Sequence, residues 1–184
     1  MRHAPIAFVL LALACSGTEP PDPPPPGSGA LIVGAGEEDG SAGFIAVDDG
    51  VDLVLQPGAQ GGFHVYVNLR FTEASLDKFG AEEKPLIRRF ARRTDAGTLV
   101  SRSTHTTTLM PAPDAEGMYD TENSIPVFLC PSPIGVQVAE ERLILEVEAA
   151  ADEDDPEPII DTLEFVPRCP EGDQEEFCRR ICFG

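Results

Sequence analysis

The stretch QPGAQGGFHVYVNLRF, residues 56–71, holds the side chains of this chain that are best arranged to do chemistry. His64 is one of only three histidines, and Tyr66, Asn68 and Arg70 follow it at every second position. An imidazole, a phenol, an amide and a guanidinium together can transfer protons or bind an anion. In a strand all four side chains would point to one face, so they are either a ligand site or an ordinary outer strand face.

The spacing of the apolar residues favours a strand here. Five apolar side chains alternate strictly with the polar ones, which indicates that one face packs on a core. These are Phe63, Val65, Val67, Leu69 and Phe71. Gly58, Gly61 and Gly62 precede the strand and are expected to supply the positive φ angles of a tight loop. His64 is therefore interpreted first as an outer-face residue, with a ligand role as the alternative.

A basic segment follows the strand. Eight of the 13 Lys and Arg residues lie between residues 70 and 102, together with only five acidic residues. Four of them, Arg88, Arg89, Arg92 and Arg93, lie close together, and arginine forks suit carboxylate or phosphate groups. If this segment lies beside the 63–71 strand, the arginines and the polar row form a surface for an anionic envelope glycan or an acidic protein partner. The alternative is that they pair with the protein's own acids.

Motifs of enzymes and cofactor sites are missing from the sequence. It contains no G-x-S-x-G, H-E-x-x-H, P-loop or dinucleotide pattern. We therefore expect a protein that is not an enzyme and has no cofactor. The alternative is a metal-dependent (calcium or other) binding module or hydrolase that uses His64, because the acidic stretches GEEDG and DEDDPEP could attract a hard cation.

Short β-like runs separated by turn signals extend from Ala30 to about residue 168. Asp48, Asp49 and Gly50 predict a hairpin within FIAVDDGVDLVL. Residues 86–106 are expected to form a second hairpin around residues 94–97, although 86–91 also fit one face of a helix. Counting the runs predicts an all-β domain, a single antiparallel, immunoglobulin-like sandwich of roughly eight strands at residues 30–168. The chain has no Trp, which excludes an antibody-type domain.

The first 14 residues have the pattern of a secretory signal, with Arg2 followed by a short apolar run. The end of that run, LALAC, resembles a bacterial lipobox, which implies that Cys15 carries lipid and anchors the protein in a membrane. Ala12 stands where that pattern usually has leucine, and Ala12-Leu13-Ala14 also fits simple signal cleavage. Ser16 after the cysteine implies, by the same resemblance, the outer membrane on its periplasmic or surface face. Residues 15–29 are proline-rich and form a semi-rigid tether.

The cysteine count is odd, at five. If Cys15 carries lipid, Cys130, Cys169, Cys178 and Cys182 remain, enough for two disulfides in an oxidising compartment. Cys178 and Cys182 are four apart in a short predicted helix, which makes pairing them awkward. We expect Cys130 to bind one tail cysteine in a disulfide-rich tail at residues 169–184, with the connectivity open. Zinc is the alternative, but only one close cysteine pair is present.

The formal net charge of −19 argues against nucleic-acid binding, because such a surface repels phosphate backbones. The partners expected are a membrane, through the lipid, and an anionic glycan or acidic protein.

The order of these segments resembles a group of exported lipoproteins of myxobacteria-type bacteria. It is carried by the proline tether, QGGFHVYVNLR, the arginine-rich hairpin, VFLCP, and VPRCP before a C-x-x-x-C tail. Those chains have a G-P-Q-G-G-x-H segment, whereas here Pro57 and Gly58 precede Ala59. The resemblance implies the fold and the location but no activity.

Overall fold

The computed structural model of the chain describes residues 29–79 and 84–183. The expected signal segment and residues 15–28 of the expected tether lie outside the described residues. Eleven strands, two α-helices and one 3₁₀ helix make up the described part: β1 (Leu31–Gly36), β2 (Phe44–Ile45), β3 (Val51–Val54), β4 (Gln56–Pro57), β5 (Phe63–Thr72), α1 (Glu73–Leu76), η1 (Asp77–Phe79), β6 (Leu86–Arg93), β7 (Leu99–Thr106), β8 (Met118–Asp120), β9 (Ile125–Cys130), β10 (Leu143–Ala150), β11 (Ile159–Arg168) and α2 (Glu175–Cys182). Neither α-helix has the length and apolar character needed to cross a membrane, as far as the described residues go.

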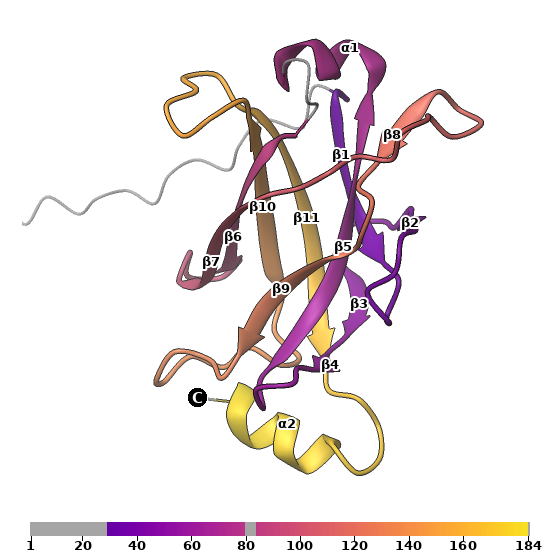
Figure 1. Cartoon of the computed structure of the whole chain (residues 1–184). Coiled ribbons are helices and arrows are strands. Elements are labelled where there is room, and N and C mark those ends of the chain that lie inside the picture. Colours follow the sequence, from indigo (N-terminus) through magenta and orange to yellow (C-terminus); the bar gives the residue numbers. More distant parts are fainter. Residues whose placement is uncertain (1–28, 80–83, 184) are drawn as a thin grey trace, which may run out of the picture.

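The strands form two sheets that pack face to face, which confirms the predicted all-β sandwich (Figure 1). The first sheet has the order β2-β1-β5-β4, and β8 and β9 also pair with β5. The second sheet has the order β3-β11-β10-β6-β7. All strand pairs are antiparallel except β11 with β3, which is parallel.

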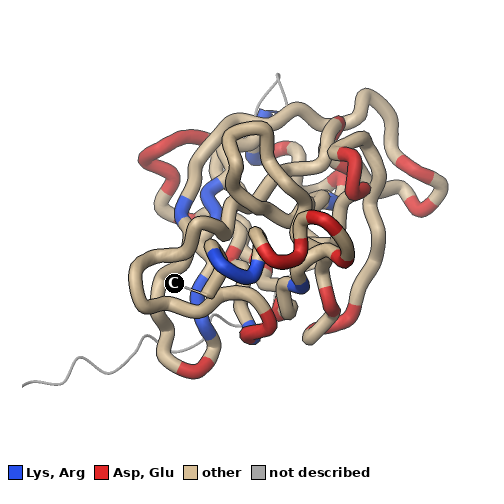
Figure 2. The backbone as a smooth tube through the Cα atoms, turned by 90° about the horizontal axis from the view of Figure 1, so that it is seen from below, with Lys and Arg blue, Asp and Glu red and all other residues tan. Residues whose placement is uncertain are grey.

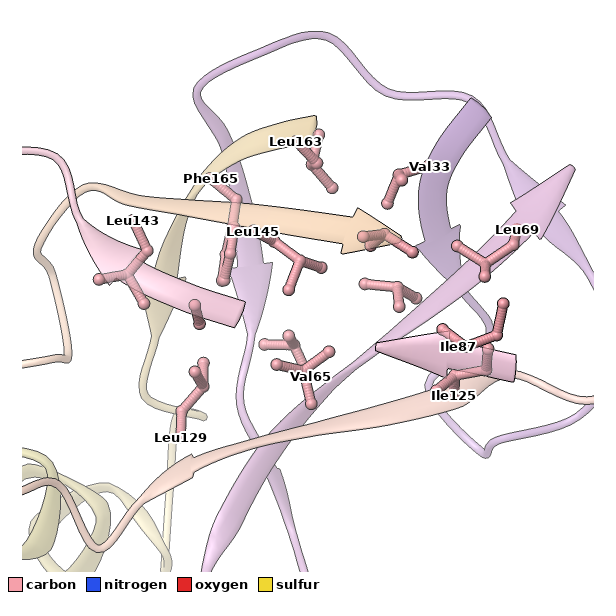
Figure 3. Packing of buried hydrophobic residues seen from close by; sticks show 14 of the residues in the cluster. Val33, Val65, Leu69, Ile87, Ile125, Leu129, Leu143, Leu145, Leu163 and Phe165 are labelled. Atoms are coloured by element: carbon pink, nitrogen blue, oxygen red, sulfur yellow. The ribbon is translucent and has the colours of Figure 1, made fainter. Parts of the chain in front are cut away.

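The core lies between the two sheets and is built from alternate residues of each strand (Figure 3). The predicted apolar row of β5 is confirmed, since all five of its side chains are at most 1% exposed. Leu143, Leu145 and Phe165 face them from the second sheet. Each such side chain contributes about 1.5–3 kcal/mol by leaving water.

The predicted hairpin at residues 86–106 is confirmed and the helical alternative is wrong. β6 and β7 pair antiparallel through a turn in which Gly97 donates to the carbonyl of Arg93 at 2.9 Å. The β-branched residues of β7 and the turn at 94–97 outweigh the helical spacing of 86–91. However, this hairpin belongs to the second sheet, whereas β5 lies in the first, so the condition for a shared surface, that the two lie side by side, is not met.

The hairpin predicted around Asp48, Asp49 and Gly50 is also wrong. These residues do form a turn, but β2 pairs with β1 in the first sheet and β3 pairs with β11 in the second. The Gly50 amide donates to the carbonyl of Glu164 at 2.7 Å, which fixes the crossing between the sheets. β2 has only two residues, too few to hold β3 in a stable hairpin.

The tail after β11 folds into α2, which lies across one end of the sandwich (Figure 1). Two disulfides fasten it, Cys130–Cys182 and Cys169–Cys178. This confirms that Cys130 joins a tail cysteine and that Cys178 does not pair with Cys182. Because all four of these cysteines are in disulfides, the disulfide prediction holds in place of the zinc alternative.

Candidate functional site

The polar row of β5 lies on the face opposite the core, as predicted, but that face is not open. His64 is 5% exposed and Asn68 is fully buried. β4 and β9 flank His64, while the segment containing β2 and the loop that carries β8 cover the other end of the row. The interpretation of His64 as an exposed outer-face residue is therefore wrong in its exposure, because loops fold back over the sheet.

His64 sits in an aromatic environment. The ring of Tyr66 meets it edge-on at 4.7 Å and the ring of Phe128 lies 5.4 Å away, centroid to centroid. Neither imidazole nitrogen has a hydrogen-bond partner among the described residues. Burial lowers the pKa of His64, which keeps the ring neutral at pH 7. A general base needs a group that orients it and access to a substrate, and no carboxylate bonds to His64 within residues 29–79 and 84–183.

The glycine loop before β5 fits the prediction only at Gly61, whose φ is +81°. Gly58 and Gly62 do not have positive φ, so the prediction is wrong for both. Gly62 is required for another reason: a Cβ there would lie 2.5 Å from the carbonyl oxygen of Cys130. The loop brings the chain close to β9 and presents no group to a ligand.

Asn68 holds a loop in place. The hydroxyl of Thr121 donates to Asn68 Oδ1 at 2.8 Å, and Asn68 Nδ2 donates to the Thr121 carbonyl at 3.4 Å. The amide of Leu69 donates to the same hydroxyl at 3.3 Å. With these bonds made inside the protein, Asn68 has a structural role.

Arg70 is also occupied within the protein. Its Nε donates to Asp120 at 2.7 Å, and its terminal nitrogens lie 2.9 Å from Asp114 and 3.4 Å from Glu116. The ring of Phe44 covers the guanidinium at 4.2 Å. The hydrogen bond to Asp120 raises the pKa of Arg70. A ligand anion would have to displace three carboxylates to reach it.

The alternation of β6 sends its four arginines to two different faces. Arg88 and Arg92 point outward, and Arg89 and Arg93 point to the side of the first sheet. Arg88 binds Glu148 at 3.0 Å, and Arg93 binds Asp95 at 2.7 Å and Glu141 at 3.3 Å. The four arginines therefore do not form one surface with β5, and Arg88 and Arg93 pair with the protein's own acids.

Arg89 is 5% exposed and has no carboxylate partner among the described residues. It donates to the carbonyl of Pro126 on β9 and lies 3.3 Å from His105 Nδ1. Burial lowers the pKa of Arg89 to about 10. Burial, together with the nearby Arg89 charge, lowers the pKa of His105 to about 4. Sequence reasoning missed this pair. The alternation of β7, which puts His105 on the inward face of the strand, is a signal that could have found it.

Besides the buried Arg89, Arg92 and Arg102 are the arginines of this region that carry no ion pair within residues 29–79 and 84–183. They lie on either side of Phe90, with their guanidinium carbons 5.9 and 5.6 Å from the ring centroid. Arg102 comes from β7, directly opposite Phe90 in the ladder. Of the four clustered arginines, Arg92 is thus the one that is neither buried nor in an ion pair among the described residues. Arg102 belongs to the predicted basic segment 70–102 but was not one of those four.

The acidic stretches use their carboxylates locally. Asp155 accepts from the amides of Ala151 and Glu157 and from Lys78, which lowers its pKa to about 2. Asp39 accepts from the amide of Ser41 at 2.9 Å. In the described part of the chain, only Cys169, Cys178 and Cys182 bring three potential ligand atoms together, and all three are in disulfides.

A surface cavity of 550 Å³ lies where α2 meets β3 and β11, a place that sequence reasoning did not find. Charged side chains line it, and they pair with one another: Arg168 with Asp52 at 3.0 Å, and Arg179 with Glu140 at 2.8 Å and with Glu175 at 3.0 Å. Of these pairs, Arg179–Glu140 joins the tail to the sandwich, whereas Arg168–Asp52 joins β11 to β3 and Arg179–Glu175 lies within α2.

The chain matches no protein-family model and no curated protein. The site must be interpreted from its own geometry.

Proposed function

We propose that this protein is a lipid-anchored bacterial envelope protein, displayed at the outer membrane as a non-enzymatic structural or binding module. The observation that carries this proposal is the cysteine pairing. Cys130, Cys169, Cys178 and Cys182 are all used in two disulfides, and Cys15 is the fifth cysteine of the sequence. An unpaired cysteine directly after a signal-like segment is what lipid attachment requires, and disulfides are typical of exported proteins.

A module without catalysis is favoured by the side chains that could have done chemistry. His64 is buried and has no orienting acid among the residues that the structure describes, and Asn68 and Arg70 hold loops in place. The two disulfides fasten α2 to the end of the sandwich. A domain made rigid in this way suits a protein that a tether holds away from a membrane. Arg92 and Arg102 on the second sheet, which carry no ion pair within the described part of the chain, support binding of an anionic envelope glycan or an acidic protein partner.

Metabolic labelling with a palmitate analogue tests the anchor. We expect label on the native chain and none on Cys15→Ser, with the native chain in the outer-membrane fraction and the variant released in soluble form. Cys130→Ser/Cys182→Ser is the matched control, because it removes cysteines and keeps Cys15. Label that persists on Cys15→Ser would refute the proposal.

A further inference from the structure

β7 forms one end of the second sheet. It is an eight-residue strand, and none of the strands in residues 29–79 and 84–183 pairs with its outer edge. Figure 1 shows the β6–β7 hairpin at the margin of the molecule, away from α2. Exposed edges of this length are templates for another chain unless something blocks them.

In an antiparallel pair, alternate residues of an edge strand bond to the neighbouring strand, and the residues between them direct their backbone groups outward. The register of β7 with β6 shows which residues those are. Thr107 donates to the carbonyl of Pro85 at 3.1 Å, so in the same register Ser101, Ser103 and His105 bond to β6. The amides and carbonyls of Arg102 and Thr104 therefore point away from β6. Both residues are exposed and place their side chains on the outer face of the sheet.

Charge on this outer face changes sign across the strands. Arg102 and Arg92 flank Phe90 near the edge, without ion pairs among the described residues. Glu146 and Glu148 stand on β10, the strand next to β6, where Glu146 lies opposite Phe90 and within electrostatic range of Arg92. β7 carries no acidic residue. Figure 2 shows that acidic residues also mark many of the loops that project from the body. In a chain of net charge −19, this edge is an exception that favours an anionic partner.

We propose that the outer edge of β7, with Arg102 and Arg92 beside it, binds an extended acidic peptide that adds to the second sheet as a further strand. The peptide backbone would pair with Arg102 and Thr104, and its carboxylates would lie over the two guanidinium groups. This deepens the proposed binding function and rests on it.

Two physical arguments favour a peptide. A peptide strand added about 4.8 Å from β7 brings its alternate side chains within reach of Arg102. The backbone of β10 would lie about 14 Å from the added strand, beyond the Debye length of about 8 Å, so repulsion between the peptide and the acids of β10 is screened. A glycan would use the arginines but leave the backbone groups of Arg102 and Thr104 in water. A second copy of this chain is disfavoured, because antiparallel pairing of two β7 edges would bring two Arg102 side chains onto one shared face.

The test uses the full chain, purified in detergent, and a fluorescent seven-residue peptide that alternates glutamate with threonine. Fluorescence anisotropy measures the affinity. We expect at least a tenfold loss of affinity for Arg92→Gln/Arg102→Gln and also for Thr104→Pro, which removes an outward amide but no bond to β6. Arg180→Gln is the matched control, since Arg180 on α2 also stacks on a ring, Phe177, and lacks an acidic partner among the described residues; its affinity should not change.

A second probe separates strand addition from simple charge attraction. The same peptide with methylated backbone amides keeps its carboxylates but cannot form the ladder, and it should bind at least tenfold more weakly. Equal affinity of the two peptides, or no binding by either, would overturn the proposal, as would binding of an oligogalacturonate with no binding of the peptide. Thermal unfolding of each variant shows that it is folded. Because lipid is not part of this readout, failure here leaves the envelope anchor standing, and failed labelling leaves the β7 site standing.

Discussion

The guanidinium of Arg89 lies 3.3 Å from Nδ1 of His105, inside the gap between the two sheets. Because the guanidinium can only donate, Nδ1 must accept and the ring must be neutral. Arg89 also donates to the carbonyl of Pro126, so it joins the edge of β9 in one sheet to β7 in the other. A cation held in this way depends on its histidine neighbour remaining uncharged.

This relationship predicts a pH dependence of stability. The pKa of His105 is about 4 in the folded protein against about 6.5 when unfolded. The unfolded chain therefore binds the proton first as the pH falls, and the stabilisation present above pH 6.5 is lost between pH 6.5 and pH 4. Between pH 7 and pH 5 we expect a loss of about 1 kcal/mol from His105, allowing for solvent screening at its partly buried position.

Urea denaturation at pH 7 and pH 5 measures this loss. His105→Asn keeps an acceptor for Arg89 but does not titrate, so its stability should depend less on pH than that of the native chain. The same pH dependence in both proteins would show that His105 is not responsible.

Gly34→Ala should destabilise the protein by about 2–4 kcal/mol. A Cβ at Gly34 would lie 2.6 Å from the Ile45 carbonyl and 2.6 Å from the Phe44 ring, which covers Arg70. Relieving the clash would move β2 away from β1 and uncover Arg70. Gly58→Ala is the matched control, because its Cβ would meet nothing closer than 3.4 Å. Denaturant midpoints compare the two, and equal losses would contradict this explanation.

The strand pattern of β5 could be predicted because it is local. Period two identifies the core row from Phe63 to Phe71 and assigns His64 to the opposite face. What covers that opposite face could not be predicted. Phe44 reaches over Gly34, and Thr121 bonds to Asn68 across 53 residues of sequence. These contacts join distant segments and leave no periodic signal.

The sequence also could not predict to which of the two sheets each strand belongs. The turn at Asp48–Gly50 has the composition of a hairpin, yet β3 finds a better partner in β11. The β6–β7 hairpin was predicted correctly, but its pattern could not show that it lies in a different sheet from β5. Consequently the acids that neutralise Arg88 and Arg93 could not be named from the sequence, although pairing within the protein was the stated alternative.

The two disulfides should contribute unequally to stability. Cys130–Cys182 spans 52 residues and Cys169–Cys178 spans nine, so the chain-entropy model gives about 4 and about 3 kcal/mol. Each bridge must be removed as a pair of alanines. A lone thiol would attack the other bridge, since the sulfurs of Cys178 and Cys182 are only 3.8 Å apart. Urea denaturation of the two double variants makes the comparison; a larger loss for the short bridge would contradict the entropic argument.

Arg70→Gln should cost about 2 kcal/mol, because it leaves the carboxylate of Asp120, only 19% exposed, without its cation. The same change frees the loop around β8, so limited proteolysis should cut between residues 110 and 120 faster than in the native chain. Arg142→Gln is the matched control. It also breaks an arginine–glutamate pair, with Glu164, but the Arg142 side chain is 58% exposed, and such pairs contribute less than about 1 kcal/mol. Equal losses in urea denaturation, or unchanged cleavage of the loop in Arg70→Gln, would mean that Arg70 does not anchor the β8 segment and is available for another partner.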